Sequence, residues 1–206
     1  LPGAKEAFSY YPSPYGIEIR IATGKKSAYS AVALQEKVCE MLGDIVFSTR
    51  GESLEEVVGA LLAESGMTVA VAESCTGGLI ADRLTDVPGS SRYLLCGVVA
   101  YSNESKVSVL GVEPELIKTY GAVSAAVAAS MAEGIRKIAN ADIGVSTTGI
   151  AGPGGGTQDK PVGLMYTGLA VEKLQFLANR IINKQIMSQT VLDHIRHYTK
   201  EIWQKK

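Results

Sequence analysis

The feature that most limits the possible folds is a series of three short apolar segments, each followed by small or polar residues, with helical patterns between them. These segments span 68–72, 93–101 and 143–148. Strands that alternate with helices form largely parallel sheets with helices on both faces. Two later segments, 162–170 and 172–177, have the pattern of an antiparallel pair. The sequence therefore predicts an α/β fold, a three-layer α/β/α sandwich with a mixed sheet.

The first fifty residues have a different pattern. Residues 15–21 alternate between apolar and polar side chains, which indicates a strand with one buried face. Residues 27–42 have apolar side chains at helical spacing, and 45–48 has the composition of a second strand. We therefore predict a small α+β domain over residues 1–50 and a larger domain over 51–206.

Composition argues against several classes of protein. The formal net charge is −1, which gives no broad basic surface for nucleic acid or an anionic membrane. No segment has the roughly 18 consecutive apolar residues of a membrane span. In the first domain, Gly24-Lys25-Lys26-Ser27 lacks the second glycine of an RNA-binding KH clamp, so a structural spacer is favoured over an RNA-binding module. We expect neither nucleic acid nor a membrane as a partner.

Cysteine usage and the first residues indicate the compartment. The three cysteines lack metal-ligand spacing, which favours the reducing cytoplasm and predicts no metal site. The chain starts with Leu-Pro-Gly, without a secretory signal pattern or an initiator methionine. We expect a cytoplasmic protein and a fragment of a longer chain.

A first candidate site follows the strand at 68–72. Ser74 lies between this strand and the next helical segment, where free amides and the helix dipole favour a developing negative charge. Gly77 and Gly78 allow a substrate to approach the backbone closely. A serine at this place is also a common helix cap, and Cys75 is a rival nucleophile. The motif needs support from elsewhere in the chain.

A second candidate site follows the strand at 93–101. Asn103 has the character of a helix N-cap, which places Lys106 in the first turn. The helix dipole and partial burial both lower the pKa of a lysine there, as a lysine general base requires. Tyr101 ends the strand and directs a hydroxyl toward the same edge. The ordinary alternative is a surface lysine paired with a glutamate.

A third candidate site is the loop after the strand at 143–148. Five of the eight residues from Gly149 to Gly156 are glycine, which suits a backbone that surrounds an anionic or planar ligand better than a flexible turn. The two histidines, His194 and His197, lie far along the chain, so a Ser–Lys pair is favoured over a Ser–His–Asp triad.

Three motifs together resemble one family. Ala72-Glu73-Ser74-Cys75-Thr76-Gly77-Gly78, Tyr101-Ser102-Asn103-Glu104-Ser105-Lys106 and Thr148-Gly149-Ile150-Ala151-Gly152-Pro153-Gly154-Gly155 closely resemble the CinA C-terminal domain, a family of nicotinamide mononucleotide deamidases. The resemblance runs from about Ser53 to the end. Residues 1–50 resemble the KH-like connecting domain of longer CinA proteins, which begin with a molybdopterin-binding-like domain that nothing here resembles.

The resemblance implies a reaction and roles for particular residues. The family converts nicotinamide mononucleotide to nicotinate mononucleotide and ammonia, as part of pyridine nucleotide salvage, with no cofactor and no metal. Ser74 corresponds to the nucleophile, Lys106 to its base and Tyr101 to a hydroxyl partner. The substrate-binding positions implied are Glu73, Thr76, Gly77, Ser91, Thr148, Gly149, Gly152, Gly154, Gly155 and Arg180. The resemblance also suggests a homodimer.

One departure from the family pattern concerns Arg180. Family members carry Gly-Asp-Arg-Glu before the final helix, whereas this chain has Asn179-Arg180-Ile181 and a shorter preceding hairpin. Only the arginine is kept. The alternative to an enzyme is therefore a non-catalytic module that binds a nucleotide and regulates other proteins.

Overall fold

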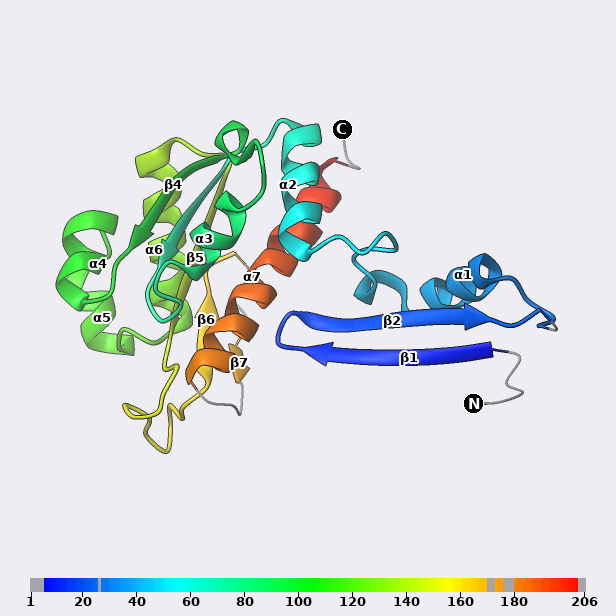
Figure 1. Ribbon diagram of the computed structural model, residues 1–206. Coiled ribbons are helices and arrows are strands. Elements are labelled where there is room, and N and C mark those ends of the chain that lie inside the picture. Colours follow the sequence, from blue (N-terminus) through cyan, green and yellow to red (C-terminus); the bar gives the residue numbers. More distant parts are fainter. Residues whose placement is uncertain (1–5, 26, 170–172, 176–179, 204–206) are drawn as a thin grey trace. The chain divides into compact units, whose positions relative to one another are not determined.

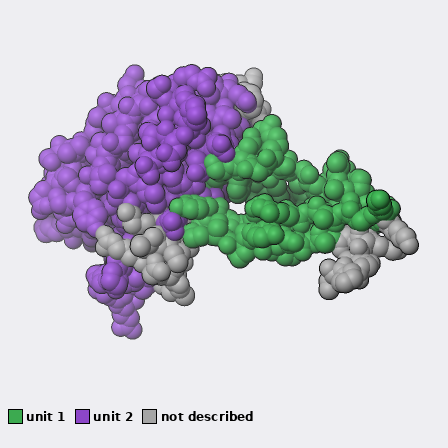
Figure 2. Space-filling model, viewed as in Figure 1, with its two compact units in different colours: residues 1–54 green, residues 55–206 purple. Residues whose placement is uncertain are grey.

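The computed structural model describes residues 6–25, 27–169, 173–175 and 180–203. The chain divides into two compact units, which are residues 1–54 and 55–206 (Figure 2). This division lies four residues after the boundary predicted from the sequence.

The first unit is built on a β-hairpin. Strands β1 (Glu6–Ser13) and β2 (Gly16–Thr23) pair antiparallel, and the Ser13 hydroxyl closes the turn by accepting the amide of Tyr15 at 3.1 Å. Helix α1 (Ala31–Leu42) follows, capped by the Ser30 hydroxyl.

Two details of the first unit differ from the sequence prediction. Strand β1 was not predicted. It contains Pro12, and a proline is tolerated in an edge strand that needs no amide there. The strand predicted at 45–48 is wrong. A short 3₁₀ helix, η1 (Gly43–Ile45), continues from α1, and the residues after it form no strand.

The second unit contains a five-stranded mixed sheet in the order β4-β3-β5-β6-β7. Its strands are β3 (Val69–Glu73), β4 (Leu94–Val99), β5 (Ile143–Gly149), β6 (Leu164–Thr167) and β7 (Lys173–Gln175). The first three in chain order are parallel to one another. Strand β6 pairs antiparallel with β5, and β7 pairs antiparallel with β6. The predicted mixed sheet is confirmed.

Helices cover both faces of this sheet, which confirms the three-layer sandwich (Figure 1). One layer holds α2 (Leu54–Ser65), α3 (Leu79–Thr85) and α7 (Arg180–Trp203). The other holds α4 (Asn103–Leu110), α5 (Pro114–Tyr120) and α6 (Ala125–Ala139), and a 3₁₀ turn, η2 (Ser90–Arg92), precedes β4. Among the described residues, no helix combines the length and apolar character needed to span a membrane.

One apolar core of the second unit lies between the sheet and α6. Ala70 and Ala72 of β3 face Val127, Met131 and Ile135 of α6, and all five side chains are fully buried. Small residues on the strand let the helix approach closely, so the sheet is held firmly beneath its functional edge.

Strand β4 is not covered on both faces, although its nearly continuous apolar sequence is typical of strands that are. Its burial alternates along the strand, with Leu95 and Val99 46% and 50% exposed. Strand β4 lies at the edge of the sheet, so it has a neighbouring strand on one side only. A continuous apolar run therefore does not distinguish an edge strand from a central one.

A buried arginine joins the three helices of one layer. Arg83 of α3 pairs with Glu55 of α2 at 2.7 Å and donates to Ser188 and Gln189 of α7. Arg83→Leu should lower the free energy of unfolding by about 3 kcal/mol, because Glu55 stays largely buried without its cation. Urea unfolding measures this.

The matched control is Arg136→Leu on α6. Arg136 pairs with Glu133, and both side chains are more than 40% exposed. Such a pair is screened by solvent, so its loss should change stability much less than the loss of Arg83. Equal effects of the two substitutions would contradict a linking role for Arg83.

Candidate active site

The three predicted motifs meet at one edge of the sheet. Glu73 at the end of β3 pairs with Val99 of β4 on one side and with Thr147 of β5 on the other. The segments after these strands therefore leave the sheet next to one another. Figure 1 shows α4, α5 and the loop after β5 (yellow) at the end to which the parallel strands point. This is the edge at which open α/β sheets form their sites.

Ser74 and Lys106 are in direct contact. The Lys106 Nζ lies 3.1 Å from the Ser74 Oγ, although 32 positions separate the residues in the chain. Lys106 is only 2% exposed and Ser74 is 8% exposed. The Ser74 amide also donates to the Thr147 carbonyl at 3.1 Å, which fixes the serine to β5. A buried lysine aimed at a serine hydroxyl is the arrangement that a Ser–Lys mechanism needs.

Three main-chain carbonyls surround the Lys106 nitrogen, and the two nearest hold it in place, while the third, of Ser102, lies at 3.5 Å. The nitrogen donates to the carbonyl oxygens of Ala100 and Tyr101 at 3.0 and 3.1 Å. A neutral amine has two hydrogens and one lone pair, so these two bonds leave the lone pair for the proton of the Ser74 hydroxyl. The ammonium form keeps the same two bonds and donates to Ser74 instead. One geometry thus serves the amine both before and after it accepts a proton.

The surroundings favour the neutral amine. Burial lowers the pKa of Lys106 from its ordinary value, against the opposing effects of Cys75 and Glu104. Lys106 also lies in the first turn of α4, where the helix dipole disfavours a cation. The predicted cap is wrong by one residue. Ser102 has the extended backbone of a cap and accepts the amide of Ser105 at 3.1 Å, whereas Asn103 is already helical.

The rival nucleophile, Cys75, has the opposite environment. Burial raises the pKa of its thiol to about 12. Its side chain is 5% exposed and packs with Ala151 and Met165 in a small apolar cluster. A thiol with so high a pKa stays protonated at neutral pH and is a poor nucleophile there. The structure therefore favours Ser74 over its neighbour.

Glu73 caps the helix that follows. Its carboxylate is 1% exposed and accepts the amides of Gly78, Ile80 and Ala81 at 2.9–3.1 Å. The sequence analysis expected free amides beside Ser74 at the helix start. Instead α3 begins at Leu79, and Glu73 already binds the amides of its first turn. The carboxylate predicted to bind substrate therefore faces the backbone of α3.

A glycine pair makes the turn between Ser74 and α3. Gly77 and Gly78 have φ angles of +66° and +96°, a region that other residues rarely adopt. This turn is the reason that α3 begins only at Leu79. The turn is closed by the Gly77 amide, which donates to the Ser74 carbonyl at 3.1 Å.

Buried threonines form hydrogen bonds in the segments next to Ser74. The hydroxyls of Thr76 and Thr147 lie 2.7 Å apart, and both side chains are fully buried. The Thr148 hydroxyl donates to the Ala122 carbonyl at 2.8 Å, which ties the end of β5 to the connection between α5 and α6. The sequence analysis did not identify Thr147. Its only sequence signal is its place among three consecutive polar residues, Ser146 to Thr148, at the end of the strand.

The glycine-rich loop covers residues 150–163, between β5 and β6. It starts beside the site, because Gly149 ends β5 and Ala151 packs against Cys75. Its middle part, 153–159, is exposed, and it contains Gly154 and Gly155, while Gly152 lies buried at its base. The loop thus has an anchored base next to Ser74 and an accessible tip.

Of the remaining predicted residues, one lies away from Ser74, one contributes its backbone, and one has no described side chain. Ser91 belongs to η2, before β4, and Leu94 of β4 pairs with Val69 at the start of β3. Ser91 therefore lies near the amino-terminal ends of the parallel strands, whereas Ser74 lies at their carboxyl ends. Tyr101 contacts Lys106 through its carbonyl oxygen, and its side chain is 60% exposed. Arg180 is the first residue of α7, and its side chain lies outside the described structure.

The two histidines belong to α7. His194 lies 3.4 Å from the Thr167 hydroxyl of β6, and His197 is 3.5 Å from Asp193 on its own helix. Among the described contacts, neither histidine reaches Ser74, in keeping with the preference for a Ser–Lys pair.

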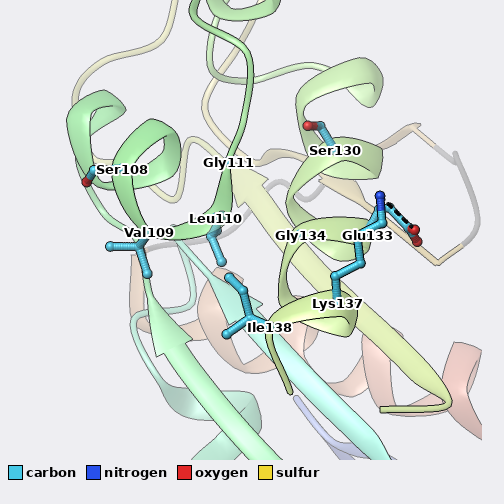
Figure 3. A pocket seen from close by; sticks show the side chains of 9 residues that line it. All are labelled: Ser108, Val109, Leu110, Gly111, Ser130, Glu133, Gly134, Lys137 and Ile138. Carbon is cyan, nitrogen blue, oxygen red and sulfur yellow. Dashed lines mark ion pairs between the residues drawn. The ribbon is translucent and has the colours of Figure 1, made fainter. Parts of the chain in front are cut away.

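A separate hollow of about 440 Å³ lies between α4 and α6 (Figure 3). Val109 and Ile138 line it on opposite sides, and the ion pair of Glu133 with Lys137 stands at its rim. It contains none of the predicted site residues, so it is distinct from the Ser74 site.

Comparison with known proteins identifies the family. The family described as the CinA C-terminal domain matches residues 51–199, most of the chain. The chain belongs to the CinA family. A relative from Moorella thermoacetica, named among the competence-damage inducible proteins, is 56% identical over 149 residues. That match covers 72% of this chain and 36% of the relative.

Another CinA-like protein, from Koribacter versatilis, is 47% identical over 186 residues, or 87% of this chain and 45% of that protein. The chain therefore spans about half or less of the length of the CinA relatives it matches. Among solved structures, a CinA superfamily protein from Klebsiella pneumoniae has a TM-score of 0.69 at 28% identity, over 72% of this chain and 96% of that one. A competence/damage inducible protein from Agrobacterium tumefaciens gives 0.62 at 35% identity, over 70% and 95%.

Proposed function

We propose that this chain is an amidohydrolase that converts nicotinamide mononucleotide to nicotinate mononucleotide and ammonia. The observation that carries the proposal is the buried contact of 3.1 Å between the Lys106 amine and the Ser74 hydroxyl. CinA membership supports the substrate class, since the motifs around these residues resemble those of nicotinamide mononucleotide deamidases.

The first half of the reaction forms an acyl-enzyme. Lys106 takes the Ser74 proton as the Oγ attacks the carboxamide carbon, giving a tetrahedral intermediate with a negative oxygen. Collapse of the intermediate breaks the C–N bond. Lys106 returns its proton to the leaving nitrogen, and ammonia departs. The second half repeats these steps with water: Lys106 takes a proton from water, hydroxide adds to the ester, and Ser74 leaves with the proton.

Main-chain amides supply the donors for the negative oxygen. Within the described residues, the Ser74 amide is bonded to Thr147, the Gly77 amide to Ser74, and the later amides to Glu73. The amides of Cys75 and Thr76 lie between them, and we assign the oxyanion to these two. Preorganised donors of this kind are a large part of catalysis in acyl transfer.

The test is ammonia release from purified chain with nicotinamide mononucleotide, nicotinamide riboside, nicotinamide and the dinucleotide. We expect the mononucleotide to be the best substrate and a chelator to leave the rate unchanged. Tight binding of the mononucleotide in calorimetry without ammonia release would instead support the non-catalytic, regulatory alternative. Absence of both binding and turnover would refute the assigned substrate class.

A further inference from the structure

In the connection between α5 and α6, the carbonyls of residues 120–123 all accept hydrogen bonds from side chains. The Lys160 Nζ donates to the carbonyls of Tyr120 and Val123 at 2.7 and 2.8 Å. The Ser124 hydroxyl donates to the Gly121 carbonyl at 2.9 Å, and the Thr148 hydroxyl donates to the Ala122 carbonyl at 2.8 Å. Four consecutive carbonyls are thus bonded from three different segments.

Lys160 is the member of this set that belongs to the glycine-rich loop. It is half-buried, and its own backbone forms a compact turn with Thr157, through bonds of 2.8 and 3.0 Å in the two directions. Gly121 leaves room for the ammonium, since a Cβ built there would lie 2.8 Å from the Nζ. The backbone of Lys160 is therefore fixed within the turn of the loop, and its ammonium group is fixed to the α5–α6 connection.

We propose that Lys160 is a positioning residue that holds the glycine-rich loop over the Ser74 site before substrate arrives. Thr148 anchors the base of the loop to Ala122, and Lys160 anchors its far end to the residues on either side of Ala122. Without the second anchor, the loop must be ordered at the moment of binding, which reduces affinity. The inference rests on the proposed deamidase function.

A lysine in a glycine-rich loop is more usually regarded as a direct phosphate ligand. The structure argues for the other role, because two of the three N–H groups of Lys160 are directed at carbonyl oxygens. The two roles make different predictions. A phosphate ligand discriminates between the mononucleotide and the nucleoside without phosphate, whereas a positioning residue supports both alike.

The activity test compares Lys160→Met, Lys160→Arg and the control Lys118→Met, whose side chain on α5 is 78% exposed. We expect Lys160→Met to raise KM on the order of 10-fold with little change in kcat. The increase in KM should be the same for the mononucleotide and for the nucleoside. Arginine should restore most of the loss, since its planar group also donates to two carbonyls. A loss confined to the mononucleotide would overturn the proposal in favour of a phosphate ligand.

Hydrogen exchange tests the same clamp without turnover. In Lys160→Met, amides of residues 150–163 and 120–124 should exchange faster than in the parent protein, and those of β3 should not change. Unchanged exchange in both segments would overturn the proposal. If the parent protein releases no ammonia, the proposed function fails, while the exchange result still decides whether Lys160 holds the loop.

Discussion

Replacing Ser74 by alanine is expected to reduce ammonia release from nicotinamide mononucleotide by a factor on the order of 10³ to 10⁶, as for removal of the nucleophile in other hydrolases. The reason is that no acyl-enzyme can form without the Oγ that faces the Lys106 amine. The substitution removes one oxygen from a small side chain, so the melting temperature should stay close to that of the parent. Steady-state kinetics and thermal unfolding of both proteins provide the measurement.

The matched control is Cys75→Ala, the adjacent residue. Its thiol is buried with a pKa raised to about 12, so its loss should cost packing but leave most of the activity. Full activity in Ser74→Ala, or complete loss in a folded Cys75→Ala protein, would overturn the assignment of the nucleophile.

Replacing Lys106 by methionine should lower kcat by a factor of about 10² to 10⁴, the usual contribution of a general base. Methionine fills much of the same space, and no charge is left buried, so the protein should stay folded. Lys137→Met is the control, because the Lys137 side chain is 70% exposed on α6. A folded Lys106→Met protein with unchanged kcat would exclude Lys106 as the base.

The pH dependence tests the same lysine in the unmodified protein. The neutral amine is the active form, so kcat/KM should rise with pH as Lys106 loses its proton and fall as pH decreases. Because burial lowers the pKa of Lys106, the midpoint should lie below the ordinary value of 10.5. Glu104 raises the pKa of Lys106, so Glu104→Gln should move the midpoint to lower pH. A shift in the opposite direction would contradict this account.

The site could be located from the sequence because each of its parts follows a strand. The residue pairs Glu73 with Val99 and Glu73 with Thr147 are consequences of parallel strands in register. Once three apolar strands are recognised, the residues after them must meet at one edge. The pattern therefore indicates that the segments carrying Ser74 and Lys106 lie at the same end of the sheet, while the pairing of these two residues came from the resemblance to the CinA family.

The supporting contacts were not predictable in the same way. Glu73 faces α3 rather than a substrate, Thr147 bonds to Thr76, and Lys160 reaches across to Tyr120. Each of these contacts depends on side-chain direction and on segments at least five residues apart in the chain. Ser91 shows the converse case, since a family motif pointed to the pocket while the strand order places it near the amino-terminal ends of the parallel strands.

In the second unit, the mixed sheet and the positions of Ser74 and Lys106 after two strands were determined by the sequence itself, because apolar periodicity and strand ends are local properties of the chain. Tertiary structure alone decided that β4 is an edge strand, that Cys75 is too buried to ionise readily, and that the Lys106 amine is held by two carbonyls. The physical reason is that burial and hydrogen-bond direction arise only when distant segments pack together, and these quantities set which groups carry charge.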